Sequence, residues 1–225
     1  MRRWWVSASW SKVCVALVIG GFLRAQGEAF RASSPPFEGL IIYKVKARGE
    51  VAEVLKENNP PTEMQLYLQR NRFLINEAGA DFAVSRLYDP DSDWVYVLDP
   101  KLKRAFKYEK YRKKAKNYPA RYIGDSLQIL GNWCYAFQVK KPDEEIIYYV
   151  SPKYRADVAS FAGKKRAQAF FLNEGLYGAI PLKMIRKRQG LIIEVTAVRL
   201  QPMRLDPESL KIPKGYQVWG YDYRR

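Results

Sequence analysis

Histidine is absent from the 225-residue sequence, and cysteine occurs only twice, as Cys14 and Cys134. Without histidine the chain has no Ser-His-Asp or Cys-His nucleophilic site and no histidine metal site. The sequence also has no glycine-rich nucleotide-binding loop. Its carboxylates gather in turn-like stretches such as Asp89–Asp93 and Pro142–Glu145. We therefore expect a protein that is not an enzyme and holds no cofactor or metal, with catalysis by carboxylates alone as the weaker alternative.

Long hydrophobic runs are scarce, and the first 29 residues have the order of a secretory signal peptide. Met1–Arg3 is basic, Val13–Leu23 is uncharged and apolar, and the small residues Ala25, Gly27 and Ala29 follow. The apolar run is about half of the ~20 residues that cross a bilayer, which favours a removable signal over a retained anchor. The sequence predicts export, with residues 1–29 as signal peptide.

The two cysteines sharpen this prediction. A lipoprotein signal requires a cysteine at the end of its apolar run, whereas Cys14 lies at the start of this one. We therefore expect a periplasmic protein without a lipid anchor. Removal of the signal leaves Cys134 without an intramolecular disulfide partner. Cys134 lies in the strand-like run Gly131–Phe137, which favours a packed core residue over a redox or intermolecular role.

The charge is strongly of one sign, with 39 Lys and Arg against 23 Asp and Glu and a formal net charge of +16. Such a balance predicts attraction to anionic partners and says little about fold. Nucleic acid is the usual partner of a basic chain, but it is scarce outside the cytoplasm. We expect no nucleic acid partner, and anionic lipid, lipopolysaccharide or acidic envelope polymer instead.

After a linker at residues 30–36, residues 37–225 read as one domain rich in short strands. Strand-like runs rich in β-branched and aromatic residues, among them Glu63–Gln69 and a long one from Ser126 to Lys140, alternate with turn residues such as Arg70-Asn71, Asp89–Ser92 and Pro100-Lys101. This close spacing leaves no room for helical crossovers and predicts an antiparallel meander. Arg155–Leu172 is predicted to be a long helix, because its apolar residues fall near helical spacing. The expected fold is mainly β (α+β): a curved antiparallel sheet or half-barrel of about ten strands, covered by that helix.

Several short motifs, in this order and spacing, resemble a branch of the LolA-like envelope proteins, which are similar to the outer-membrane lipoprotein carriers. They are Phe37–Gly39, Gly131–Cys134, Gly178 with Pro181-Leu182, and Ile212–Tyr216, and Asp93–Arg104 resembles the strand, Asp-Pro and basic turn of the carriers. The resemblance covers nearly all of residues 37–225. It implies an incomplete barrel whose apolar concavity accepts acyl chains. The chain departs from the carriers by a higher positive charge and a basic insertion.

Aromatic residues on the expected strands and helix supply a candidate ligand cavity. The stripe of Trp133, Tyr135 and Phe137 is either ordinary sheet core or the wall of an apolar cavity. In a half-barrel the two readings overlap, because the core face and the cavity wall are the same face. The full candidate set is Trp94, Tyr96, Trp133, Tyr135, Phe137, Phe161 and Phe170.

A basic segment between residues 101 and 121 supplies a second candidate site. Its cations are interleaved with aromatic residues, which indicates contact with anionic headgroups or phosphates, whereas the alternative is a solvated loop that keeps the protein soluble. The candidate residues are Lys103, Arg104, Lys107, Lys110, Arg112, Lys113, Lys114 and Lys116. Two functions follow: binding of an acyl chain, lipid or lipoprotein lipid in the half-barrel, or binding of anionic polymer or lipopolysaccharide by the basic surface. The oligomeric state is left open.

Overall fold

The computed structural model describes residues 35–49, 61–79, 83–108, 118–161, 176 and 178–220. The chain divides after Ser33 into two compact units, and the described residues all lie in the second, Ser34–Arg225. None of the helices among these residues has both the length and the apolar character needed to span a membrane.

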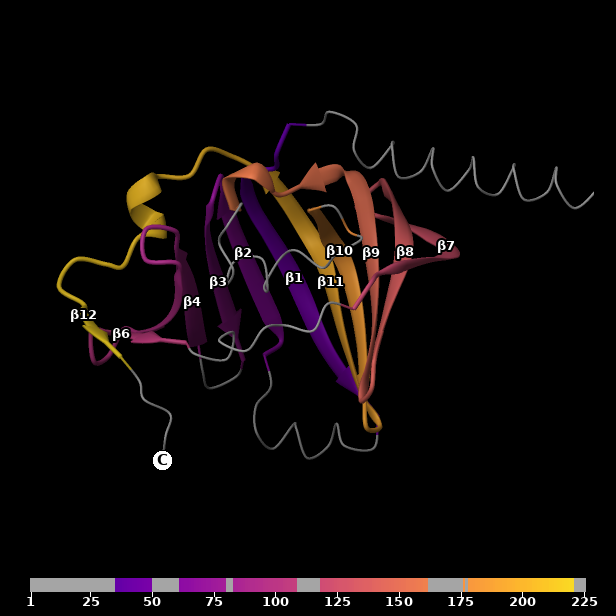
Figure 1. Cartoon of the computed structure of the whole chain (residues 1–225), viewed down its shortest axis with the longest axis horizontal. Coiled ribbons are helices and arrows are strands. Elements are labelled where there is room, and N and C mark those ends of the chain that lie inside the picture. The colour runs from indigo at the N-terminus through magenta and orange to yellow at the C-terminus, as the bar shows by residue number, and fades with distance from the viewer. Residues whose placement is uncertain are drawn as a thin grey trace, which may run out of the picture. The chain divides into compact units, whose positions relative to one another are not determined.

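The described residues form a single twelve-stranded sheet (Figure 1). Its strands are β1 (Gly39–Arg48), β2 (Glu63–Gln69), β3 (Arg72–Ala78), β4 (Ala83–Asp89), β5 (Trp94–Asp99), β6 (Arg104–Lys107), β7 (Arg121–Ile129), β8 (Asn132–Lys141), β9 (Glu144–Arg155), β10 (Ala179–Arg188), β11 (Leu191–Pro202) and β12 (Gln217–Trp219). Two short 3₁₀ turns, η2 (Ala159–Phe161) and η3 (Pro207–Leu210), accompany them.

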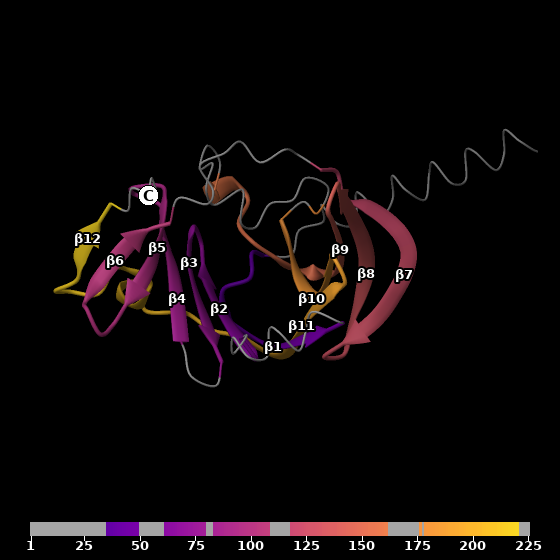
Figure 2. The ribbon, with the colours of Figure 1, turned by 90° about the horizontal axis from the view of Figure 1, so that it is seen from below.

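The spatial order is β12-β6-β5-β4-β3-β2-β1-β11-β10-β9-β8-β7, so two antiparallel meanders join where β1 pairs with β11. The β12–β6 pair is parallel and forms one edge of the sheet, and β7 forms the other. The sheet curves, so that β4–β6 and β7–β9 rise on either side of β1 and β11 (Figure 2). The two edges do not pair with each other, and the sheet is therefore open.

Strand β1 shows how the sequence specifies this sheet. Ile41 and Tyr43 are buried on one face, whereas Lys44 and Lys46 on the other face are exposed, which is the alternation expected of a half-buried strand. Gly39 begins the strand at a φ of 144°, and a Cβ there would lie 2.2 Å from the carbonyl oxygen of Gln201. Only glycine permits this close approach of β1 to β11, which accounts for the Phe37-Glu38-Gly39 motif.

The predicted fold class is wrong about the long covering helix that it placed at Arg155–Leu172. Where a long helix was expected from Arg155, strand β9 continues to that residue, and the carbonyl oxygen of Arg155 accepts a 2.7 Å hydrogen bond from the backbone of Phe37. Asp157 then holds Ser160 through its carbonyl and carboxylate oxygens, which closes the 3₁₀ turn η2 instead. Tertiary pairing of the backbone thus overrides the helical spacing. Residues 162–175 lie outside the described residues.

The expected strand number is also too low, because the sheet has twelve strands. One expected long strand from Ser126 to Lys140 is a hairpin, in which β7 and β8 are joined by Leu130 and Gly131, both at positive φ. The described part of the chain is therefore nearly all β, an open sheet without a helix of seven residues or more.

Candidate apolar ligand face

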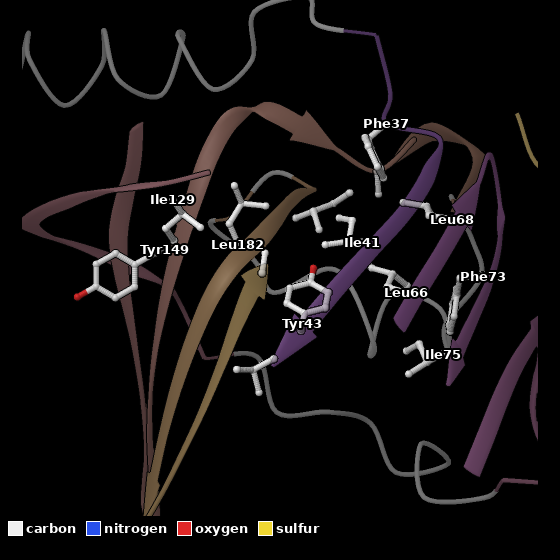
Figure 3. Packing of buried hydrophobic residues seen from close by; sticks show 14 of the residues in the cluster. Phe37, Ile41, Tyr43, Leu66, Leu68, Phe73, Ile75, Ile129, Tyr149 and Leu182 are labelled. Carbon is white, nitrogen blue, oxygen red and sulfur yellow. The ribbon is translucent and has the colours of Figure 1, made fainter. Parts of the chain in front are cut away.

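One face of β1–β5 is largely apolar, and an ion pair between Glu77 and Arg86 lies at one end of it. The register pairs Ile41 with Leu66 and Leu66 with Ile75, so alternate residues of three strands form one row. A second row runs from Leu68 through Phe73 and Tyr88 to Val95, whereas the first row meets Arg86 on β4. We define the apolar face as Ile41, Tyr43, Leu66, Leu68, Phe73, Ile75, Tyr88 and Val95, all of which are buried (Figure 3).

The hydroxyl group of Tyr43, a polar atom on this face, is hydrogen-bonded within the protein. The hydroxyl of Tyr43 donates a 3.0 Å hydrogen bond to the carbonyl oxygen of Pro181 on β10. Burial raises the pKa of Tyr43 well above its usual range, so the phenol stays neutral. Met64 pairs with Tyr43 and packs at the margin of the face, where it is half-buried. The other neighbour of Met64 is Glu77, which pairs with Arg86, so charged side chains begin where the apolar face ends.

The 3₁₀ turn η2 covers part of the apolar face. The ring of Phe161, which is fully buried, lies 6.0 Å from the ring of Tyr88, and Tyr88 stacks on Phe73 with ring centroids 5.1 Å apart. Three aromatic rings from η2, β4 and β3 are thus layered over the sheet. An apolar ligand would have to enter between the sheet and such a cover.

The structure separates the predicted ligand residues of β5 from this face. Trp94 and Tyr96 alternate with Val95, so they lie on the opposite side of the strand from the apolar face. Tyr96 is buried there, 3.1 Å from the hydroxyl of Ser92. The ring of Phe161 packs on Tyr88 of the apolar face. The sheet therefore lies between Phe161 and the side chains of Trp94 and Tyr96.

The β8 stripe lies on one side of its strand, opposite the fully buried Cys134 and Ala136. Tyr135 and Phe137 are half-buried and meet Tyr122 of β7, with ring centroids 6.5 and 5.7 Å apart. Trp133 is 57% exposed, and Phe170 lies outside the described residues. The structure therefore joins only two of the three stripe residues in one aromatic cluster.

Sequence reasoning missed both Tyr122 and the apolar face of β1–β3. The signal was present as strict alternation, with Ile41 and Tyr43 on one strand and Leu66 and Leu68 on the next. The prediction selected the largest aromatic residues instead, and these lie on β5 and β8. The packed-core reading of Cys134 is confirmed, because its side chain is fully buried and burial raises the pKa of its thiol to about 11.

Three of the predicted cationic residues fall in the described part of the chain. Lys103 is exposed in the turn before β6, Arg104 lies with its guanidinium 4.2 Å from the ring centroid of Trp219, and the ammonium of Lys107 lies 5.1 Å from that of Trp94. The others, Lys110, Arg112, Lys113, Lys114 and Lys116, lie outside the described residues.

A cleft of about 580 Å³ lies at the tips of the β8–β9 and β10–β11 hairpins, and its charges are paired. Lys187 contacts Glu145 at 3.0 Å, and Arg188 contacts Asp143 at 3.0 Å. Burial raises the pKa of Glu144, but hydrogen bonds from Arg186 and Lys141 outweigh it and leave the pKa below its usual value. This cleft suits ions and shares no residue with the apolar face.

A second cleft, of about 590 Å³, lies beside the start of β1, where Phe37 and Tyr154 meet edge to face. Arg70 and Lys153 line it together with Glu38. In the described ranges no group of three or more metal-ligating side chains occurs. Neither cleft therefore assembles a recognisable catalytic or metal site from these residues.

The comparisons with known proteins leave the family open. No family model matches the chain, and no curated protein matches it in sequence. An uncharacterised conserved protein from Thermus thermophilus is 10% identical at a TM-score of 0.49, over 82% of this chain and 91% of that one. A PNGF-II structure is 11% identical at 0.41, over 81% and 32%, and LprF from Mycobacterium bovis is 6% identical at 0.33, over 78% and 92%.

At these identities and TM-scores the likenesses assign neither a family nor an activity. The resemblance to LolA-like proteins therefore remains one of motifs, and the open, curved antiparallel sheet is compatible with it.

Proposed function

We propose that this chain is an exported, non-enzymatic binding protein that holds an acyl chain against the apolar face of β1–β5. The observation that supports the proposal is a row of paired apolar residues on four adjacent strands, Leu68, Phe73, Tyr88 and Val95, with Ile41 and Tyr43 of β1 beside it on the same face of an open, curved sheet. Hydrocarbon is the ligand class that such a surface favours.

The energetics of acyl binding are adequate for this surface. Each methylene withdrawn from water contributes about 0.8 kcal/mol, so a chain of about sixteen methylenes gains about 13 kcal/mol against an association cost of ~4–15 kcal/mol. The residues of the apolar face are buried, so uptake requires the cover to open, and Phe161 of η2 is part of that cover. Lipid or lipoprotein sorting would be a use of this binding.

Two adjacent residues of β2 provide a matched test. Met64 and Gln65 are both half-buried, but Met64 points to the apolar face and Gln65 to the other side. Met64→Lys and Gln65→Lys add the same charge to the same strand. With a fluorescent fatty acid as the probe, we expect Met64→Lys to weaken binding at least about tenfold, because an ammonium enters the apolar face.

Gln65→Lys should bind the probe as the unchanged chain does, since the new lysine lies on the opposite side of β2 from the apolar face. Both variants share every other residue, so probe bound elsewhere on the chain cancels in the comparison. Equal binding by the two variants, or no probe binding by the delipidated protein, would sink the acyl-chain proposal.

The second candidate function is binding of anionic envelope polymer or lipopolysaccharide through the basic surface. It is supported by the net charge of +16 and by the exposed Lys44, Lys46 and Arg48 on the outer face of β1. Surface binding of this kind weakens steeply with added salt. It also predicts that Gln65→Lys, on the same face as Lys44, strengthens polymer binding more than Met64→Lys does, and the opposite order or salt-insensitive binding would exclude it.

Export to the periplasm is proposed from the N-terminal sequence alone. Cell fractionation with mass analysis of the mature N-terminus tests it. We expect a periplasmic species that begins near residue 30, and a cytoplasmic species that retains Met1 would contradict export.

A further inference from the structure

At two places in the described sheet a leucine and a tryptophan are exposed on the same or neighbouring segments. Leu102, in the turn between β5 and β6, is 56% exposed, and Trp219 of β12 is 42% exposed. Leu130 and Trp133, at the β7–β8 hairpin at the other end of the sheet, are 46% and 57% exposed. Exposed apolar side chains that gather at one place indicate a surface that meets a partner.

The first pair lies on a structured edge. The backbone of Gln217 donates a 2.9 Å hydrogen bond to the carbonyl oxygen of Lys103, and this contact places β12 beside the β5–β6 turn. Trp219 is then in register with Phe106. We name this surface the β6–β12 edge, made of Lys101, Leu102, Lys103, Arg104, Lys214, Val218 and Trp219.

The two exposed surfaces differ in charge. Three exposed lysines, Lys101, Lys103 and Lys214, lie along the β6–β12 edge. The carboxylate of Asp99 does not oppose them outward, because it accepts hydrogen bonds of 2.9 Å from the backbones of Lys101 and Leu102. The β7–β8 tip, from Gln128 to Trp133, has no charged residue.

Arg104 joins the cationic and apolar parts of the edge. Its guanidinium lies 4.2 Å from the ring centroid of Trp219, and this stacking holds the indole at the rim of the sheet. Val218 projects from the other side of β12 and is 52% exposed. Cations, an indole and aliphatic side chains on one edge match the interface of an anionic bilayer, where headgroup charge lies directly above hydrocarbon.

We propose that the β6–β12 edge docks on an anionic lipid surface, with Leu102 and Trp219 entering the headgroup boundary and the surrounding lysines contacting lipid phosphates. This inference deepens the proposed function, since an acyl chain must be collected from or delivered to a membrane. A vesicle assay measures docking and the fatty-acid assay measures uptake, so the two proposals fail separately.

The second exposed pair provides a matched control. Leu102→Ser/Trp219→Ser and Leu130→Ser/Trp133→Ser remove the same two side chains from opposite ends of the sheet, at exposed positions where folding is tolerant. Binding of the full chain is measured by co-sedimentation with phosphatidylcholine vesicles that contain phosphatidylglycerol. We expect the first variant to bind about tenfold more weakly or worse, and the second to bind as the unchanged chain does.

The charge is tested in the same assay. Lys101→Gln/Lys103→Gln should weaken binding about fivefold per lysine, and vesicles of phosphatidylcholine alone should bind poorly. Equal losses in the two serine variants, or equal binding to charged and uncharged vesicles, would overturn the proposal. So would a change of oligomeric mass in Leu102→Ser/Trp219→Ser with vesicle binding intact, because the edge would then be a contact between copies of the chain.

Discussion

Phe161→Ala removes the described aromatic cover from the apolar face while leaving the sheet's own residues intact. Phe161 is fully buried, and its ring lies 6.0 Å from that of Tyr88 at an interplanar angle of 49°. Truncation therefore withdraws a whole ring from a packed interior and removes the contact of Phe161 with the stack of Tyr88 on Phe73. The expected result is a large loss of stability at a residue outside the strands.

The magnitude follows from the burial. Phenylalanine-to-alanine changes at fully buried sites cost about 3–5 kcal/mol, because lost transfer energy and the cavity add together. The contact with Tyr88 accounts for about 0.5–1.5 kcal/mol of this. In a unit of this size a loss of 1 kcal/mol lowers the midpoint of thermal unfolding by about 2–4 °C, which predicts a fall on the order of 10 °C.

Urea unfolding followed by tryptophan fluorescence measures the effect, with an unchanged slope as the sign that stability alone has altered. Val158→Ala is the control, because Val158 lies in the same segment but is 38% exposed. It should cost less than about 1 kcal/mol. A loss that small in Phe161→Ala would refute the packing of η2 on the sheet.

Two further predictions concern ionisation. Glu144 is 8% exposed and its pKa is lowered, so the stability it contributes is present above its unfolded pKa of about 4.5 and is lost as pH falls through the folded value. Glu144→Gln should therefore destabilise the chain at pH 7 and flatten its acid unfolding, whereas Glu208→Gln, at the exposed Lys211 pair, should do little; identical acid curves for Glu144→Gln and the unchanged chain would contradict this. In a Cys14→Ser background the Cys134 thiol should resist Ellman's reagent until urea unfolds the chain, because it is buried with a pKa raised to about 11; rapid labelling of the folded protein would contradict it.

The strands were largely predictable from local pattern. Glu63–Gln69 was expected with the bounds that β2 has, and the turn residues between β2 and β6 fall where expected. These strands are bounded by Gly, Asn, Asp and Pro, whose conformational preferences act within a few residues. Antiparallel pairing followed because the connections are too short for crossovers.

The errors arose where tertiary contacts decided the structure. Leu130 adopts a φ of 49° in the β7–β8 turn, a conformation that leucine rarely takes, so Gly131 was the one residue of the two-residue turn that marked the hairpin. Similarly, β12 is only three residues long and is defined by its pairing with β6. The helix expected from Arg155 failed because the backbone of Arg155 pairs with Ala179 and Phe37.

The sequence predicted an apolar site on a curved sheet, but it assigned that site mostly to the wrong residues. An apolar face on a curved sheet was expected, and the structure places it on β1–β5, with Phe161 the one predicted residue packed on it. Trp94 and Tyr96 lie on the opposite face because strand alternation, not side-chain size, decides which way a residue points. The register that joins Ile41, Leu66 and Ile75 depends on pairing between strands, which single-strand patterns do not specify.

The central claim is that the apolar face of β1–β5 accepts an acyl chain, and the comparison of Met64→Lys with Gln65→Lys tests it most directly. In a titration with a fluorescent fatty acid, the account predicts at least about a tenfold weaker affinity for Met64→Lys and an unchanged affinity for Gln65→Lys. Equal affinities in the two variants, with both proteins folded, would contradict it.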